Sequence, residues 1–262
     1  MELQLAGKTY AVGGASSGLG RAIAEQLIGE GATVIGMARS EDKLRHLANI
    51  YGSQFVAHSV DLSDTDAVAH TAGYLQEQRL AGCVFNTGGP PTGTVDELSL
   101  ANWDTAYAGT LRWKVQLTKA LLPGLRERGE GSLLYVESVS IKQPIDNLVL
   151  SNAFRAAVAG FVKTLSREEG RHGIRANILA PGYHATDRIT TVLEKAADLQ
   201  GVPVEQIRDQ FLQEVPLASL GQPMNFAALA SSSHYRQSAD GCHNSIVSEV
   251  ETRTSVYAMS FG

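Results

Sequence analysis

Short apolar runs and amphipathic stretches alternate along the chain. The runs are rich in β-branched residues and predict strands at 8–14, 32–39, 54–62, 80–89, 131–138 and 174–182. Between them, apolar residues recur with a helical period, which predicts helices at 20–31, 40–52, 64–78, roughly 102–128 and 150–169. Strands that alternate with helices favour a parallel sheet covered on both faces. No change in composition marks a linker and no internal repeat is visible, so we expect residues 1–262 to form a single α/β domain.

The composition limits the classes of protein to consider. The 262 residues are 44% hydrophobic, which is enough for a large core. The net charge of −5 disfavours nucleic acid and anionic membranes as partners, because phosphate groups require clustered Lys and Arg. The sequence has no signal-peptide pattern and no apolar run of bilayer length, and its cysteines, Cys83 and Cys242, suit free thiols in a reducing compartment. We therefore expect a cytoplasmic protein, with no membrane or nucleic-acid partner and no metal site.

The strongest chemical motif is the glycine-rich stretch "VGGASSGLGRAIAEQL" between the first strand and the first helix. Gly14, Gly18 and Gly20 are spaced so that the backbone turns tightly, approaches a pyrophosphate and packs the helix on the strand. The N-terminus of the helix adds free N–H groups and a positive dipole end. Because the motif lies in a strand–turn–helix context, it predicts a dinucleotide site rather than a purely structural turn.

Cofactor choice depends on the end of the second predicted strand. NAD sites usually carry Asp or Glu there, whereas an arginine accommodates the 2′-phosphate of NADP. Here the strand ends in Ala38, Arg39 and Ser40. We expect Arg39 and Ser40 to bind that phosphate, which favours NADP(H); the alternative is that Arg39 is a solvated surface charge.

Further motifs lie in order along the chain: "VDL" at 60–62, "NTGG" at 86–89 and "HGIRANILAPGYHATD" at 172–187. Together with "GGASSGLG", they resemble the classical short-chain dehydrogenases/reductases over about residues 3–226, especially β-ketoacyl-carrier-protein reductases with imperfect motifs. The resemblance implies a Rossmann-type, doubly wound parallel sheet. It also implies a cofactor site made of Gly14, Ser16, Ser17, Gly18, Leu19, Gly20, Arg39, Ser40, Asp61, Leu62, Asn86, Gly88, Arg155, Pro181, Gly182 and Thr186.

The chain departs from this family at its catalytic positions. Members use Asn, Ser, Tyr and Lys, and the matching positions here are Thr110, Ser138, Ser151 and Arg155. A serine hydroxyl has no accessible pKa near neutrality, and Arg155 cannot give up its proton. We expect Ser151 and Arg155 to be stacked neighbours four residues apart on one helix, with Arg155 able to hold a ribose hydroxyl.

Several alternatives for the missing acid stay open. Ser151 either handles protons or simply caps the helix. Glu137 precedes Ser138, and strand alternation predicts that its side chain faces away from that serine. Tyr183 and His184 follow the "APG" segment and are either catalysts or packing residues, and Lys142 is either a proton donor or a solvated charge.

Two function classes follow from this pattern. The first is an NADP(H)-dependent carbonyl reductase or alcohol dehydrogenase with an atypical proton path, acting on a small carbonyl or alcohol substrate. The second is an NADP(H)-binding relative that has lost the family reaction and serves as a sensor, an assembly partner or a catalyst of other chemistry. The resemblance further implies a substrate lid around 187–217 and a homodimer or homotetramer, whereas the tail 231–262 lacks the family's closing strand and Asp-Gly-Gly.

Overall fold

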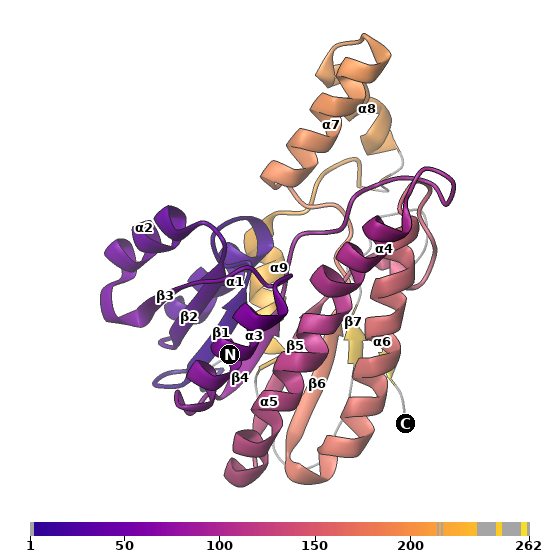
Figure 1. The fold of residues 1–262 in the computed structure, drawn as a ribbon. Coiled ribbons are helices and arrows are strands. Elements are labelled where there is room, and N and C mark those ends of the chain that lie inside the picture. Colours follow the sequence, from indigo (N-terminus) through magenta and orange to yellow (C-terminus); the bar gives the residue numbers. More distant parts are fainter. Residues whose placement is uncertain (1–2, 214, 216, 235–244, 248–257, 261–262) are drawn as a thin grey trace.

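A twisted sheet forms the centre of the molecule (Figure 1). The computed structural model describes residues 3–213, 215, 217–234, 245–247 and 258–260. The strands are β1 (Thr9–Gly13), β2 (Thr33–Ala38), β3 (Phe55–Ser59), β4 (Gly82–Phe85), β5 (Gly131–Val136), β6 (Ile174–Leu179), β7 (Ser245–Val247) and β8 (Ala258–Ser260). Their order in the sheet is β3-β2-β1-β4-β5-β6-β7-β8, and every pairing is parallel except that of β7 with β8. The predicted α/β, Rossmann-type parallel sheet is confirmed.

Helices cover both faces of this sheet because the central strands are apolar on both sides. One face packs against α1 (Gly18–Gly29), α2 (Glu41–Tyr51) and α9 (Pro223–Ser232). The other packs against α3 (Thr65–Gln76), α5 (Trp113–Arg128) and α6 (Val149–Glu169). Cys83 on β4 lies buried in this second core as a free thiol, whereas Cys242 lies outside the described residues.

The predicted helical stretch at roughly 102–128 is confirmed, but it contains a π-helical turn that the sequence period does not show. The chain forms α4 (Leu100–Tyr107), a π-helical turn over Ala108–Arg112, and then α5. A π turn admits an extra residue into the helix, and such turns are frequent at functional sites. Within it Thr110 is buried, and the Trp113 indole N–H donates to the Gly109 carbonyl at 3.0 Å. Sequence periodicity does not detect one inserted residue, because both flanking helices keep their apolar faces.

The expected lid segment is helical. It forms α7 (Asp187–Gln200) and α8 (Val204–Gln213), which rise from the sheet at the top of Figure 1 around a small core of Leu193, Ala197 and Ile207. In the tail, β7 adds to the sheet beside β6 through the pairs Ile178–Ile246 and Leu179–Val247. The expectation that a closing strand is missing is therefore wrong. Of the described part of the chain, no helix combines the length and hydrophobicity that a bilayer crossing requires.

Candidate active site

The glycine turn is packed tightly against the end of β4. Gly14 and Gly18 have φ values of +64° and +55°, which favour glycine. A Cβ at Gly14 would lie 2.7 Å from the Asn86 amide nitrogen, and a Cβ at Gly20 would collide with the Gly14 carbonyl. Asn86 in turn donates from Nδ2 to the Gly13 carbonyl at 3.2 Å. The turn and the β4 end thus form one rigid surface, as the sequence motifs imply.

The opposite side of this surface is bounded by the segment after β6. A Cβ at Gly18 would be in van der Waals contact with the Thr186 side chain, at 3.6 Å, so the turn lies close to Thr186. The backbone N–H groups of the glycine turn and of the start of α1 are of the kind that binds a pyrophosphate. In this respect the residues present suit a dinucleotide.

A cavity of about 420 Å³ opens beside the glycine turn and the start of α2. It is lined by Ser16, Ser17, Gly18, Arg21, Asp42, Lys43, His46 and Asp187. Arg39 is exposed at the end of β2, and Ser40 is the N-cap residue of α2 without a side-chain capping bond. Sequence reasoning missed Lys43 and Arg21. The detectable signal was a second cation four residues after Arg39, in the first turn of the helix that follows β2.

Asp61 is oriented by its own loop after β3. Its Oδ1 accepts hydrogen bonds from the Ser63 hydroxyl at 2.7 Å and the Ser63 N–H at 2.9 Å. These bonds hold the pKa of the Asp61 carboxyl below its usual value, so the group stays ionised at neutral pH. The neighbouring Leu62 is buried.

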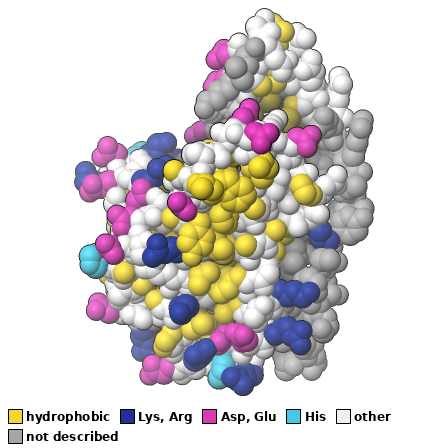
Figure 2. All heavy atoms as spheres, turned by 45° about the vertical axis from the view of Figure 1, so that its right-hand side comes forward, with side chains coloured by type: hydrophobic (Ala, Val, Ile, Leu, Met, Phe, Trp, Pro, Cys, Tyr) yellow, Lys and Arg dark blue, Asp and Glu magenta, His cyan; other side chains and the backbone are white. Residues whose placement is uncertain are grey.

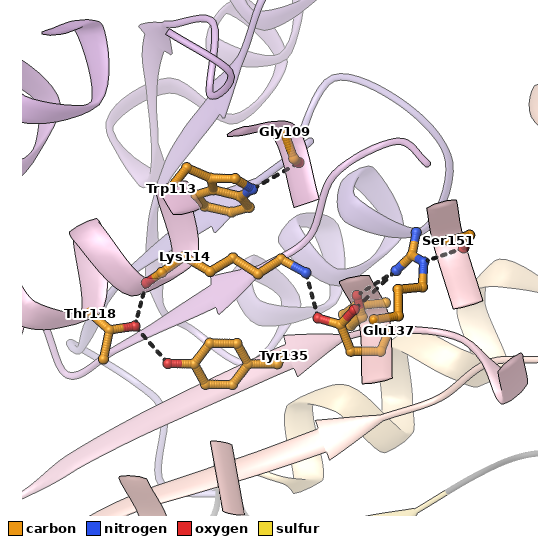
Figure 3. Close-up of polar contacts among 9 residues, drawn as sticks. Gly109, Trp113, Lys114, Thr118, Tyr135, Glu137 and Ser151 are labelled. Atoms are coloured by element: carbon orange, nitrogen blue, oxygen red, sulfur yellow. Dashed lines mark hydrogen bonds and ion pairs between the residues drawn. The ribbon is translucent and has the colours of Figure 1, made fainter. Parts of the chain in front are cut away.

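A buried cluster of charged side chains lies between α5, α6 and the end of β5 (Figure 3). Lys114 donates from Nζ to Oε1 of Glu137, and Arg155 Nη1 lies 3.2 Å from Oε2 of the same carboxylate. The Lys114 and Glu137 side chains are completely buried and that of Arg155 is 8% exposed. Burial lowers the pKa of Lys114, and the Glu137 charge opposes that shift. We call these three residues the ion cluster.

The position of Glu137 corrects the expectation that it faces away from the catalytic positions. Tyr135, two residues earlier on β5, faces α5 and α6, where its hydroxyl contacts Thr118 at 2.7 Å. Glu137, the first residue after β5, points to the same face, toward Arg155. The expectation failed because it applied strand alternation to Glu137 and Ser138, and both residues lie beyond the end of β5 at Val136.

Ser151 does not cap its helix, so that alternative is wrong. Helix α6 has Leu148 as its N-cap residue, and Ser151 is the third helical residue. The Ser151 hydroxyl is buried and accepts a hydrogen bond from Arg155 Nε at 3.0 Å, and Arg155 Nη1 also donates to the Val136 carbonyl at 3.4 Å. The two residues are stacked neighbours, as their spacing predicts, and they are joined to the ion cluster.

Ser138 has a local role that leaves its hydroxyl hydrogen available. Its Oγ accepts the Ser140 N–H at 3.2 Å and caps the short 3₁₀ turn Val139–Ile141. A hydroxyl that accepts one bond still has its own O–H to donate.

Comparison with known proteins agrees with this geometry. The family model of the short chain dehydrogenases matches residues 8–197, well over half of the chain. This chain is a member of the short-chain dehydrogenase family. A curated relative, 3-oxoacyl-(acyl-carrier-protein) reductase of Vibrio harveyi, is 30% identical over 212 residues, covering 79% of this chain and 86% of the relative. D-beta-hydroxybutyrate dehydrogenase of Cupriavidus necator is 28% identical over 86% of this chain and 90% of the relative.

Solved structures of this family resemble the fold closely. L-sorbose reductase from Gluconobacter frateurii, complexed with NADPH and L-sorbose, has a TM-score of 0.84 at 26% identity and covers 90% of this chain and 92% of its own. Actinorhodin polyketide ketoreductase with NADPH has a TM-score of 0.81 at 27% identity, covering 89% and 92%.

In this short-chain dehydrogenase, the other candidate acids lie in packing environments. His184 is buried, with Nδ1 3.4 Å from the Gly182 carbonyl and its ring against Phe226. Tyr183 packs edge-on against Phe211 of α8. Lys142 is exposed just after the 3₁₀ turn.

Two further residues of this short-chain dehydrogenase escaped the sequence analysis. Lys114 lies on α5 one helical turn after Thr110, and this spacing could have marked it as a candidate site residue. Its pairing with Glu137 could not be predicted from the sequence. Arg188 begins the lid segment, and its guanidinium lies against Gly89, in the loop after β4.

Proposed function

We propose that this protein is an NADP(H)-dependent oxidoreductase of the carbonyl reductase or alcohol dehydrogenase type with an atypical proton path. The cofactor supplies or accepts a hydride at its nicotinamide ring when bound. The glycine turn and Asn86 support a dinucleotide site. The relatives crystallised with NADPH support the choice of NADP(H).

We assign residues to the parts of the cofactor as the family resemblance implies. The turn assigned to the pyrophosphate consists of Gly14, Ser16, Ser17, Gly18, Leu19 and Gly20, and the 2′-phosphate is assigned to Arg39, Ser40 and Lys43. The adenine is assigned to Asp61 and Leu62. The nicotinamide half is assigned to Asn86, Gly88, Pro181, Gly182 and Thr186. Lys43 and Arg21 both line the cavity next to the glycine turn, and two cations at one cavity support a phosphate there.

The observation that carries the proposal is the ion cluster at the family's catalytic positions. Lys114, Glu137 and Arg155 together bear one net positive charge when all three are ionised. Reduction of a carbonyl places negative charge on its oxygen, and a preorganised cation in a buried site stabilises that charge. Arg155 keeps its proton, so it acts as a fixed charge rather than as an acid.

Two hydroxyls remain for the substrate oxygen. Ser138 accepts the Ser140 N–H and is left with its own O–H to donate. Ser151 accepts from Arg155 Nε and is likewise left with an O–H, which reaches a substrate oxygen through a bridging water because serine is much shorter than tyrosine. The proton is passed from water along these hydroxyls instead of from a phenol.

A second function is favoured by a different aspect of the same residues. Within the described structure, Arg155 donates hydrogen bonds to the Ser151 hydroxyl, the Val136 carbonyl and the Glu137 carboxylate. Its side chain is only 8% exposed. A cation held in this way suits an NADP(H)-binding protein that has lost the family reaction and serves as a sensor or assembly partner.

A substrate panel with NADPH separates the two functions. NADPH binding is measured first by fluorescence titration, and oxidation of NADPH is then followed by absorbance with ketones, aldehydes and oxo acids. We expect binding and turnover of at least one class. Binding without turnover on any class would favour the second function, and absence of NADPH binding would contradict both.

A further inference from the structure

Arg188 lies where the lid segment meets the loop after β4. It is the second residue of α7, and its guanidinium rests on Gly89. A Cβ at Gly89 would lie between 2.5 and 2.9 Å from Nη2, Nη1 and Cζ of Arg188. Any side chain at position 89 would therefore displace the guanidinium, and the glycine leaves it room beside the cofactor-side end of β4.

Arg188 has no anionic partner in the described part of the chain. No hydrogen bond or ion pair joins it to a described residue, whereas Arg126 and Arg155 are paired with Glu169 and Glu137. The adjacent carboxylate, Asp187, lines the cavity beside Ser16 and Ser17. Among the described residues, the guanidinium of Arg188 thus has no counter-ion, and it lies at the edge of the site.

A second cation lies close to Arg188. Protein atoms packed around the Arg188 guanidinium lower its pKa, and the positive charge of Arg155 lowers it further. The carboxylate of the ion cluster does not compensate Arg188, because Glu137 is already shared between Lys114 and Arg155. The two like charges disfavour each other, and an anion between them would be attracted by both.

We propose that the substrate carries a carboxylate, and that Arg188 binds it near Arg155. This rests on the proposed oxidoreductase function and narrows its substrates to small oxo or hydroxy acids. The planar fork of arginine matches a carboxylate with two parallel hydrogen bonds. A cofactor phosphate is the other anion available, but the cavity assigned to the phosphates is lined by Lys43 and Arg21, not by Arg188.

Binding of paired acids and amides tests this inference without requiring turnover. The probes are acetoacetate with acetoacetamide and 2-oxobutanoate with 2-oxobutanamide, titrated by calorimetry into the full-length protein with and without NADPH. We expect at least one acid to bind about tenfold or more tightly than its amide, because charge-assisted bonds are lost in the amide. Arg188→Gln should weaken that acid by a similar factor and leave the affinity for NADPH unchanged.

Matched variants identify the cause of any loss. Arg167→Gln removes an exposed arginine in the last turn of α6, away from the cofactor cavity and the lid segment, and should bind the acid like the unmutated protein. Arg188→Lys keeps the positive charge but lacks the planar guanidinium fork, so its affinity for the acid should lie between those of the unmutated protein and of Arg188→Gln. Equal binding of acids and amides, or absence of binding by both, would overturn the inference. So would an Arg188→Gln variant that loses NADPH affinity instead, since Arg188 would then be a cofactor phosphate ligand. Acid binding without NADPH oxidation would reject the proposed reaction alone.

Discussion

Arg155 Nη1 lies 3.2 Å from Oε2 of Glu137 in the interior of the protein. Glu137 directly follows β5 and Arg155 lies on α6, and the same carboxylate also accepts a hydrogen bond from Lys114 of α5. Side chains from α5, α6 and the end of β5 thus form one connected set of buried charges. Their removal should therefore affect both the stability of the fold and the chemistry of the site.

Glu137→Gln should destabilise the protein strongly. The change leaves the buried Lys114 and Arg155 without their carboxylate, and breaking a buried ion pair on one side typically costs about 3–5 kcal/mol. The free energy of unfolding in urea is the measurement. Glu41→Gln breaks an exposed pair with Arg45 and should hardly change the midpoint. Equal effects of the two variants would show that the ion cluster contributes no more than a surface pair.

Restoring the family pair should require removal of the ion cluster. In Ser151→Tyr with Arg155→Lys, Glu137 would still hold the new ammonium, so we expect little gain in rate. Adding Glu137→Ser and Lys114→Thr removes the carboxylate together with its second cation, so the new ammonium is free to act on the phenol. General acid–base assistance should then raise NADPH-dependent ketone reduction by on the order of 10²–10⁴. Thr110→Asn is the next addition, because residues that act as a unit are strongly non-additive. No gain with NADPH bound and circular dichroism unchanged would mean that the pocket itself differs.

The cofactor preference should depend on Arg39. We expect NADPH to bind more tightly than NADH, because Arg39 is exposed at the end of β2 and Lys43 lines the adjoining cavity. Arg39→Asp should weaken NADPH selectively, whereas Arg45→Ala, on the same helix as Lys43 but outside the cavity, should leave both affinities unchanged. Fluorescence titration measures this, and equal affinities in the unmutated protein would contradict the assignment.

Stability should fall in mild acid because of His234. Burial, aided by the charge of Arg175, lowers the pKa of His234 to about 3, whereas an unfolded histidine titrates near 6.5. Between these values the unfolded chain binds a proton that the native state refuses, so this contribution is complete above about pH 6.5 and is lost as the pH falls toward 3. Urea midpoints at about pH 7.5 and about pH 5 measure the slope. His234→Gln should reduce the change in urea midpoint between the two pH values. His70 is exposed, so His70→Gln should leave that change as it is.

Self-association should involve the side formed by α4, α5 and α6. Figure 2 shows hydrophobic side chains gathered on this side of the molecule. There Tyr107 is 44% exposed and, like Trp103, packs against Phe154. We expect a homodimer or homotetramer, since closed symmetric assemblies predominate. Tyr107→Asp should shift light scattering toward the monomer, and Ile50→Asp on α2 should not; a monomeric unmutated protein would contradict the prediction.

The sequence by itself determined the elements and the cofactor turn. Strand and helix periods are local, so the alternation that predicts the parallel sheet is readable without any contact. The glycines after β1 are also local signals, because Gly14 and Gly18 adopt positive φ values that other residues avoid. The Ser151–Arg155 contact follows in the same way from the i, i+4 geometry of one helix.

Only the tertiary structure decided what surrounds that pair. Glu137 is 18 residues from Arg155 and 23 from Lys114, and no sequence period links them. Their contact arises because β5 ends between α5 and α6, which fixes the face that Glu137 occupies. The approach of Arg188 to Gly89 likewise depends on two loops at the same edge of the sheet. A charge acquires its role from neighbours brought together by packing, and packing is the part of the energy that local patterns do not contain.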